Sequence, residues 1–183
     1  MALQNIPEII NFDKAVALNS SYEGVIGHEN LPRLAEACTS ITGDAEASFR
    51  FYKDLQGLRM IEGKVSCEVE VICQRCGEPF KLKLAASYKC SCDYEKAESL
   101  KIADRMEFVE PDENSDLNMF SFLEECLLLE LPYAPTHEEG SPDCKRSGSE
   151  WSYGELAKEA EESPFAALSG LKEAFAKQGK KDR

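Results

Sequence analysis

The sequence predicts an α+β fold, in which an antiparallel β-sheet with a long hairpin is packed by helices and followed by a helical tail. Residues 65–73 and 80–88 each alternate apolar and polar side chains, which is typical of half-buried strands, and a short turn with Gly77 joins them. Between residues 117 and 131, leucine and phenylalanine recur at helical spacing. This pattern indicates an amphipathic helix that covers the sheet.

The segments before the hairpin predict smaller elements. Residues 1–30 suggest a strand or extended arm followed by a loop that is rich in Ser, Asn and Gly. A short helix fits residues 31–38, because Asn30 can cap it and Pro32 stands in its first turn. Alternation at residues 47–51 predicts a further strand.

Breaks and caps divide the next part of the chain. Gly63 is expected to interrupt the strand that leads into the hairpin. Residues 90–114 are acidic and weakly patterned, so we expect a loop or a partly disordered crossover. Asp116 is placed to cap the following helix, which carries Glu124 on its polar face and ends at Pro132.

The end of the chain predicts a separate helix. Residues 133–150 are rich in Pro, Gly and Ser, and a helix fits residues 163–175, where Ser163 can cap the first turn. The expected organisation is an α+β domain over residues 1–150, which carries the hairpin-tip cysteines. A linker and a C-terminal interaction helix are expected over residues 151–183.

Composition indicates a water-soluble globular protein. The 183 residues are 43% hydrophobic, no apolar run approaches the length of a membrane helix, and the amino end lacks the pattern of a secretory signal. The expected location is therefore the cytoplasm. In that reducing compartment the eight cysteines are poor disulfide candidates, so each is expected to fill core space, bind a metal or act as a thiol.

Charge is unevenly distributed along the chain. The net charge of -13 argues against a uniformly basic surface for nucleic acid. Acidic residues outnumber basic ones over residues 92–130, whereas basic residues prevail in the hairpin and in the C-terminal tail. The basic segments are either solvated faces or contacts with RNA or an RNA-bound partner.

Cys73 and Cys76 stand at the hairpin tip in the sequence CQRCG. A redox pair with this spacing needs its first thiol at the start of a helix, but the residues after Cys76 have strand character. A zinc knuckle needs two thiolates in a tight turn with glycine after the second, and Gly77 provides it. The sequence therefore favours half of a zinc site, which two further Cys or His ligands must complete.

The chain offers three sources for the missing ligands: Cys90 with Cys92, the isolated Cys38 and Cys126, or His137 with Cys144. A strand rises about 3.3 Å per residue, so the first pair is expected on the order of 30 Å from the tip. Cys38 and Cys126 lie on apolar helix faces and are expected to be buried thiols. His137 and Cys144, in the loop after a helix, are the expected ligands of a structural zinc ion without an open coordination position.

The order of these features resembles the YceD-like family, the large ribosomal RNA subunit accumulation proteins. The resemblance rests on CQRCG at residues 73–77, LLLELPYAP at residues 127–135 and PFAAL at residues 164–168, and it extends over most of the chain. In many relatives a cysteine in a shorter loop matches His137. The resemblance implies a cytoplasmic, non-enzymatic factor that supports the synthesis, processing or stability of large-subunit ribosomal RNA (rRNA).

The resulting hypothesis is a zinc-stabilised module that binds ribosomal proteins, precursor large-subunit rRNA, or both, with no membrane and no small-molecule substrate. Its acidic stretch can steer basic ribosomal proteins. The candidate contacts with RNA or a partner are Arg75, Lys81, Lys83, Lys89, Phe165, Leu168, Lys177, Lys180 and Lys181.

Two alternatives remain open. One is an enzyme, either a thiol oxidoreductase that uses Cys73 and Cys76 or a metal-dependent nuclease centred on His137, although no serine-hydrolase motif or phosphate-binding loop accompanies these residues. The other is a metal-free domain in which the cysteines only pack.

Overall fold

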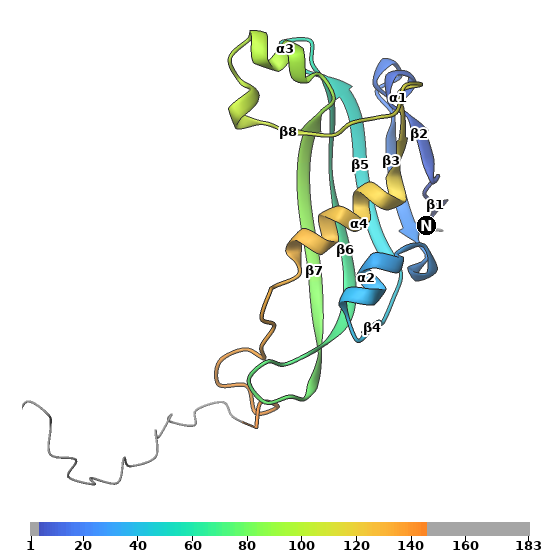
Figure 1. Cartoon of the computed structure of the whole chain (residues 1–183). Coiled ribbons are helices and arrows are strands. Elements are labelled where there is room, and N and C mark those ends of the chain that lie inside the picture. The colour runs from blue at the N-terminus through green and yellow to red at the C-terminus, as the bar shows by residue number, and fades with distance from the viewer. Residues whose placement is uncertain (1–3, 146–183) are drawn as a thin grey trace, which may run out of the picture. The chain divides into compact units, whose positions relative to one another are not determined.

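The computed structural model describes residues 4–145, which lie in one compact unit and form the α+β fold that the sequence predicts (Figure 1). The strands of its main sheet are β1 (Gln4–Asn5), β3 (Ser21–Ile26), β4 (Ser40–Ile41), β5 (Ala45–Lys53), β6 (Arg59–Ile72), β7 (Pro79–Ser91) and β8 (Glu107–Phe108). They pair in the order β1-β3-β5-β6-β7-β8, and β4 pairs with β6 beside this path. Pairing is antiparallel except between β1 and β3 and between β7 and β8.

Short helices and a second, two-stranded sheet complete the described part of the chain. β2 (Ile9–Asn11) pairs antiparallel with β9 (Asp116–Asn118). The helices are α1 (Phe12–Ala17), α2 (Pro32–Ala37), α3 (Tyr94–Ser99) and α4 (Met119–Glu130), with 3-10 turns η1 (His28–Asn30) and η2 (Ala103–Arg105).

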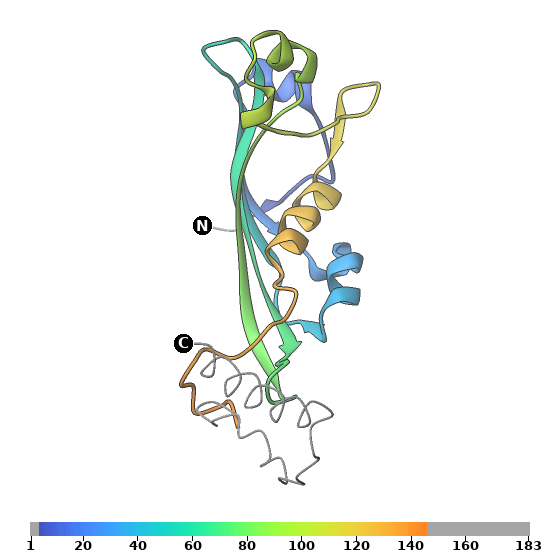
Figure 2. The ribbon, with the colours of Figure 1, turned by 60° about the vertical axis from the view of Figure 1, so that its left-hand side comes forward.

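β6 and β7 form the long hairpin that the alternating pattern predicts. They pair antiparallel from Met60 opposite Ser91 to Ile72 opposite Pro79. Alternate side chains of both strands enter one hydrophobic core, which also receives the apolar sides of α1, α2 and α4. Figure 2 shows α2 and α4 on the same face of the sheet. The opposite side chains of the hairpin are therefore left for solvent or partners.

The amino-terminal region is more structured than predicted. The loop expected before residue 30 contains β3, which pairs with β5 over six residues. The short helix α1 comes before β3, and Asn11 caps it by accepting the Lys14 N–H at 3.1 Å. Asn30 does not cap α2, because it belongs to η1 and Leu31 takes the cap position. These elements are too short for a clear periodic pattern, and their pairing partners lie elsewhere in the sequence.

Gly63 lies inside β6 and does not interrupt it, contrary to the prediction. It stands opposite Phe49 of β5. A Cβ atom at Gly63 would lie 2.5 Å from the Phe49 Cβ atom and 2.5 Å from the Ser48 carbonyl oxygen. Glycine is therefore required here for close packing between strands rather than for a break.

Residues 90–114 are not the loop that was expected. They contain α3, η2 and β8, and Ala97 of α3 packs with Met60 in a second small cluster. Asp93 accepts hydrogen bonds from the Arg59 backbone N–H at 2.7 Å and from Arg59 Nε at 2.8 Å. Only Ala97 of α3 is buried, so this acidic helix has no apolar stripe from which the sequence could have predicted it.

Helix α4 begins later than predicted and buries a carboxylate. Asn118, not Asp116, caps it by accepting a backbone N–H of the first turn. Glu124, expected on the polar face, is only 3% exposed, and its Oε1 accepts the Leu34 N–H at 3.0 Å. Leu34 lies in the first turn of α2, which has no side-chain cap of its own. Glu124 therefore caps α2 from a neighbouring helix.

No helix within residues 4–145 has both the length and the apolar character needed to cross a membrane. The helix predicted at residues 163–175 and the domain boundary predicted at residue 150 lie outside the described residues.

Candidate metal centre

The hairpin tip holds Cys73 and Cys76 in a turn that backbone hydrogen bonds stabilise. The Cys73 N–H donates to the Glu78 carbonyl at 2.9 Å, and the Gly77 N–H donates to the Cys73 carbonyl at 2.8 Å. Gly77 has a φ of 78°, a left-handed conformation that glycine adopts without strain. The two Sγ atoms consequently lie within 4.8 Å of each other.

The loop after α4 returns the chain to this tip. The Gln74 N–H donates to the Pro135 carbonyl at 2.9 Å. The His137 ring lies against Phe80 of β7, with ring centroids 4.6 Å apart. These contacts bring His137 to Cys76, although the two are 61 positions apart in the sequence.

Four potential ligands converge where these segments meet: Cys73, Cys76, His137 and Cys144. Their ligand atoms all lie within 4.8 Å of one another, and Cys76 Sγ is 3.6 Å from His137 Nδ1. Tetrahedral zinc, with Zn–S of about 2.3 Å and Zn–N of about 2.0 Å, separates a sulfur and a nitrogen ligand by about 3.6 Å. The donor types and their spacing therefore fit a zinc ion.

The thiols at the tip differ in pKa. Burial raises the pKa of Cys73, but hydrogen bonds with the backbone of His137 and Cys76 outweigh it and lower this pKa to about 5. A hydrogen bond with the Glu78 backbone lowers the pKa of Cys76, but burial and the thiols of Cys73 and Cys144 outweigh it, so this pKa is raised. Adjacent thiolates repel each other, and a bound cation would stabilise them together.

The burial of the cluster is typical of a structural site. Cys73, His137 and Cys144 are 0%, 8% and 4% exposed, and Cys76 is half-buried. Four protein ligands fill a tetrahedral shell and leave no open position for a substrate. The same features disfavour an oxidoreductase, because a disulfide substrate needs access to a thiol, and this pair follows a strand instead of starting a helix.

The other cysteines that were considered as ligands lie away from the tip. Cys90 stands opposite Ile61 near the far end of the hairpin, as predicted, and Cys92 follows it. Burial raises the pKa of Cys90 and of Cys92 to about 11. Cys38 and Cys126, which were predicted to be buried thiols, pack against the core but are only half-buried.

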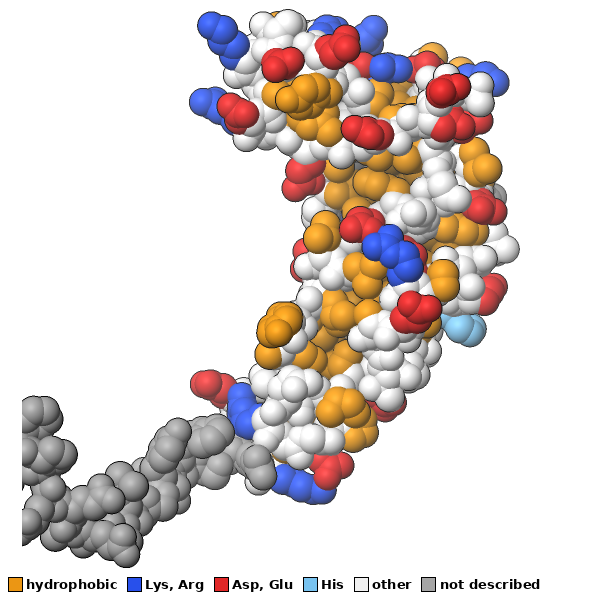
Figure 3. Space-filling model, viewed as in Figure 1, with side chains coloured by type: hydrophobic (Ala, Val, Ile, Leu, Met, Phe, Trp, Pro, Cys, Tyr) orange, Lys and Arg blue, Asp and Glu red, His pale blue; other side chains and the backbone are white. Residues whose placement is uncertain are grey.

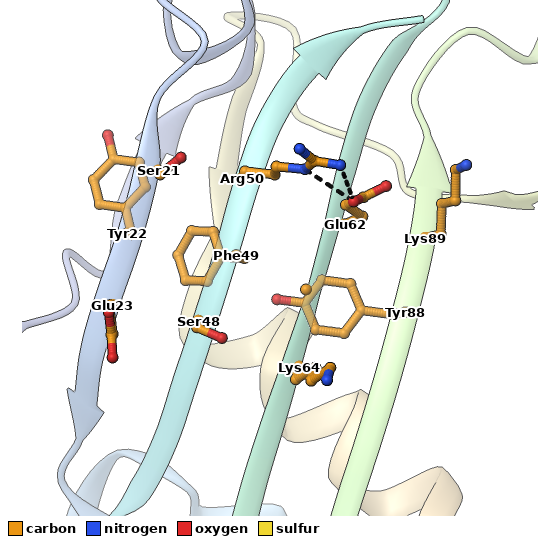
Figure 4. Close-up of a pocket in the computed structure, with 11 residues that line it drawn as sticks. Ser21, Tyr22, Glu23, Ser48, Phe49, Arg50, Glu62, Lys64, Tyr88 and Lys89 are labelled. Atoms are coloured by element: carbon orange, nitrogen blue, oxygen red, sulfur yellow. Dashed lines mark hydrogen bonds and ion pairs between the residues drawn. The ribbon is translucent and has the colours of Figure 1, made fainter.

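The basic residues proposed as contacts do not form one cluster. Lys81 and Lys83 lie together on the exposed side of β7, and Lys89 lies about 20 Å farther along the strand. Lys81 Nζ is 2.9 Å from Glu68 Oε1. Arg75 is half-buried at the tip. Lys89 also lines a pocket of about 640 Å³ whose walls carry both charges. There, Arg50 Nε donates a hydrogen bond to Glu62 Oε1 at 2.9 Å (Figure 4).

Phe80 and Lys145, for which no sequence pattern indicated a role at this site, help to close the cluster. Lys145 forms an ion pair with Glu78, next to the ligand segment of the hairpin. Alternation placed Phe80 on the buried side of the strand, but nothing in the sequence indicated that a histidine ring would cover it. The proposed contacts in the tail are outside the described residues: Phe165, Leu168, Lys177, Lys180 and Lys181.

Comparison with known proteins assigns this chain to a family. A family model described as large ribosomal RNA subunit accumulation protein YceD matches residues 61–172, which include all four ligand residues. The chain belongs to the YceD family. A YceD protein of Haemophilus influenzae with the same description is 34% identical over 157 residues, which cover 83% of this chain and 87% of that relative. No solved structure matches this YceD-family chain.

Proposed function

We propose that this protein supports the accumulation of large-subunit rRNA as a cytoplasmic, non-enzymatic binding module whose hairpin tip is closed by a structural zinc ion. The proposal is carried by the convergence of three cysteine thiols and one histidine ring in a chain of the YceD family. Zinc held by Cys73, Cys76, His137 and Cys144 would fix the loop after α4 against the hairpin. Its role would be to keep a binding surface in shape.

Charge favours basic ribosomal proteins as partners of the described residues. A groove of about 450 Å³ beside the start of α4 is bordered by Glu110, Asp112, Asp116 and Glu125. An acidic border raises the local concentration of basic proteins and repels RNA phosphates. The net charge of -13 acts in the same direction.

Precursor rRNA is the less favoured partner of the hairpin. β7 carries three lysines, and Lys89 lies about 20 Å from the other two, so the strand offers an RNA backbone no continuous row of cations. Arg75 at the tip and Lys177, Lys180 and Lys181 in the tail remain the candidate phosphate contacts.

The rRNA role is tested in cells that lack the protein. Deletion is expected to lower the ratio of large-subunit to small-subunit rRNA, and the wild-type gene should restore it. A Cys73→Ser/Cys76→Ser double variant should not restore the ratio, whereas Cys38→Ser should. An unchanged ratio after deletion would reject the rRNA role. Full restoration by the double variant at equal protein level would reject the metal role.

The partner class is tested with purified components. Affinities for large-subunit ribosomal proteins and for precursor rRNA are measured over a series of salt concentrations. Ribosomal proteins should bind more tightly, with an affinity that falls as salt rises. Binding that ignores ionic strength, or tighter binding of rRNA, contradicts the proposed partner class.

A further inference from the structure

Among the residues that the structure describes, one edge of strand β7 is free over most of its length. β7 pairs with β6 along its whole length, but on its other edge β8 pairs only with Cys90 and Ser91. Within residues 4–145, no strand pairs with the segment Pro79–Lys89 on that edge. Figure 1 shows β7 at the border of the sheet along the part that the short β8 does not cover. A long free edge is a template for pairing with another extended chain.

The hydrogen-bond pattern identifies the residues that face this edge. The Cys73 N–H donates to the Glu78 carbonyl at 2.9 Å, which makes them a hydrogen-bonded pair at the end of the hairpin. Such pairs alternate along antiparallel strands, so the even-numbered residues of β7 bond to β6. On the other edge, the Ser91 carbonyl accepts the Val109 N–H at 3.0 Å, which agrees with this phase. The backbone groups that point to the free edge are therefore those of Lys81, Lys83, Ala85, Ser87 and Lys89.

The two sides of the edge differ in character. The odd-numbered residues from Pro79 to Lys89 have exposed side chains. The even-numbered side chains lie on the core side of the sheet, where the Tyr88 and Phe122 rings meet at 5.0 Å. Helical spacing continues the Phe122 stripe through Cys126 and Leu129, and Leu129 is 79% exposed. Figure 3 shows hydrophobic side chains gathered on the face that carries α4. An added strand would meet lysines on one side and apolar groups on the other.

The pairing of β7 with β6 shows which charge fits between the strands. Each lysine of β7 stands opposite a glutamate of β6: Lys81 with Glu70, Lys83 with Glu68 and Lys89 with Glu62. β7 itself contains three lysines and no acidic residue. Opposite charges across neighbouring strands stabilise pairing, and like charges directly opposite destabilise it. An acidic strand on the free edge would place each lysine between two carboxylates.

The same rule disfavours a second copy of this chain. If two β7 strands paired antiparallel about Ala85, Lys81 of one copy would face Lys89 of the other, and the lysines would repel. A basic segment is disfavoured for the same reason. At the start of β7 the surface is also hollowed into a groove of about 860 Å³ between residues 78–83 and residues 136–145, which leaves room for the end of an added strand.

We propose that the free edge of β7 binds an extended segment of a partner protein by strand addition, and that this segment alternates acidic and apolar residues. Main-chain hydrogen bonds to the odd-numbered residues provide affinity, and the lysines and the apolar flank of α4 select the alternation. This inference requires neither the zinc ion nor the rRNA role. Its failure would leave both of those proposals standing.

The test uses the full chain and three fluorescein-labelled octapeptides. One alternates Glu and Val, one replaces each Glu by Lys, and one has the Glu and Val residues in blocks. The alternating Glu peptide should bind about tenfold more tightly than either control in fluorescence anisotropy. On binding, hydrogen exchange measured by NMR should slow at the amides of Lys81, Lys83, Ala85, Ser87 and Lys89.

Ala85→Pro is the sharpest variant, because it removes an outward N–H and leaves the hydrogen bonds to β6 intact. It should abolish peptide binding, whereas Ala85→Val, which keeps the N–H, should not. Circular dichroism verifies that both variants are folded. If Ala85→Pro does not fold, the pattern of amide protection that the peptide produces in the wild type tests the inference instead.

Three results overturn the inference: equal binding of all peptides, protection outside β7, or displacement of the bound peptide by a decameric uridine RNA. The lysines then serve another purpose. If Lys83→Gln makes the protein self-associate without affinity for the Glu peptide, they only prevent strand pairing, and the inference is also wrong.

Discussion

Replacing Cys144 by serine is expected to separate the contribution of zinc from that of ordinary packing. The side chain is 4% exposed and belongs to the ligand cluster, while its backbone N–H donates to the Ser141 carbonyl at 3.2 Å and is unchanged by the substitution. Serine replaces sulfur by oxygen at nearly constant volume. A large effect of Cys144→Ser therefore reports on the ion.

The expected magnitude follows from linkage. If free zinc is about a thousandfold above its dissociation constant, it stabilises the folded protein by about 4 kcal/mol. Cys144→Ser should remove most of this in buffered zinc. In a chelator, where neither protein holds the ion, the two proteins should differ by less than about 1.5 kcal/mol, the usual scale of one polar contact.

The assay is urea unfolding of both proteins in buffered zinc and in chelator, with zinc content measured by mass spectrometry. The wild type should hold one zinc per chain and Cys144→Ser far less. Cys38→Ser, at a half-buried cysteine outside the cluster, is the control and should respond to zinc as the wild type does. A structural zinc ion at this cluster is ruled out if chelator leaves the stability of the wild type unchanged, or if Cys144→Ser keeps its zinc.

Three further substitutions test packing and charge through urea unfolding. Glu124→Ala should lower the free energy of unfolding by about 1–3 kcal/mol, because it leaves a buried N–H of α2 without an acceptor, while Glu125→Ala at an exposed ion pair should lower it by less than about 1 kcal/mol. Equal effects would contradict the capping role. Gly63→Ala should cost about 1–3 kcal/mol by crowding the neighbouring strand, whereas Gly43→Ala, which has open space, should be nearly neutral. Burial raises the pKa of Asp93, but hydrogen bonds with Arg59 outweigh this effect, so the pKa in the folded protein is lowered. The Asp93 carboxylate therefore stabilises the fold above its unfolded pKa of about 3.9. This stabilisation is lost as the pH falls through the folded pKa. Asp93→Asn should therefore destabilise the protein at pH 7, and the difference from wild type should shrink below about pH 4, whereas a gap independent of pH would disprove the ion pair's role.

The hairpin could be predicted from sequence because its pattern is long. Alternation over the 14 residues of β6 and the 13 of β7 outweighs local exceptions such as Gly63. β3, α1 and α3 have at most six residues each, and one or two polar side chains are enough to hide their pattern. Their positions depend on pairing and packing with distant segments, which local alternation does not encode.

Glu124 shows a different limit. Charged residues of an amphipathic helix normally face water, so periodicity placed this side chain on the polar face. Its partner is a backbone N–H that is 90 residues away in the sequence. The four candidate metal ligands could be proposed from the sequence because cysteine and histidine carry chemical information in themselves. The contacts that bring them together, such as Phe80 with His137, carry no such signal.

The candidate metal site and the free edge of β7 meet at the groove beside residues 136–145, and their coupling can be predicted. The candidate ligands Cys73, His137 and Cys144 are buried but do not belong to the main hydrophobic core, so the tip has less apolar packing than the rest of the hairpin. Without zinc, the loop should no longer border the groove in a fixed position. Removing zinc should therefore reduce the protection that the alternating Glu peptide gives to the amides of Lys81 and Lys83, and leave protection at Lys89 unchanged. A uniform loss along β7, or no loss at all, would show that the loop and the strand edge are not coupled in this way.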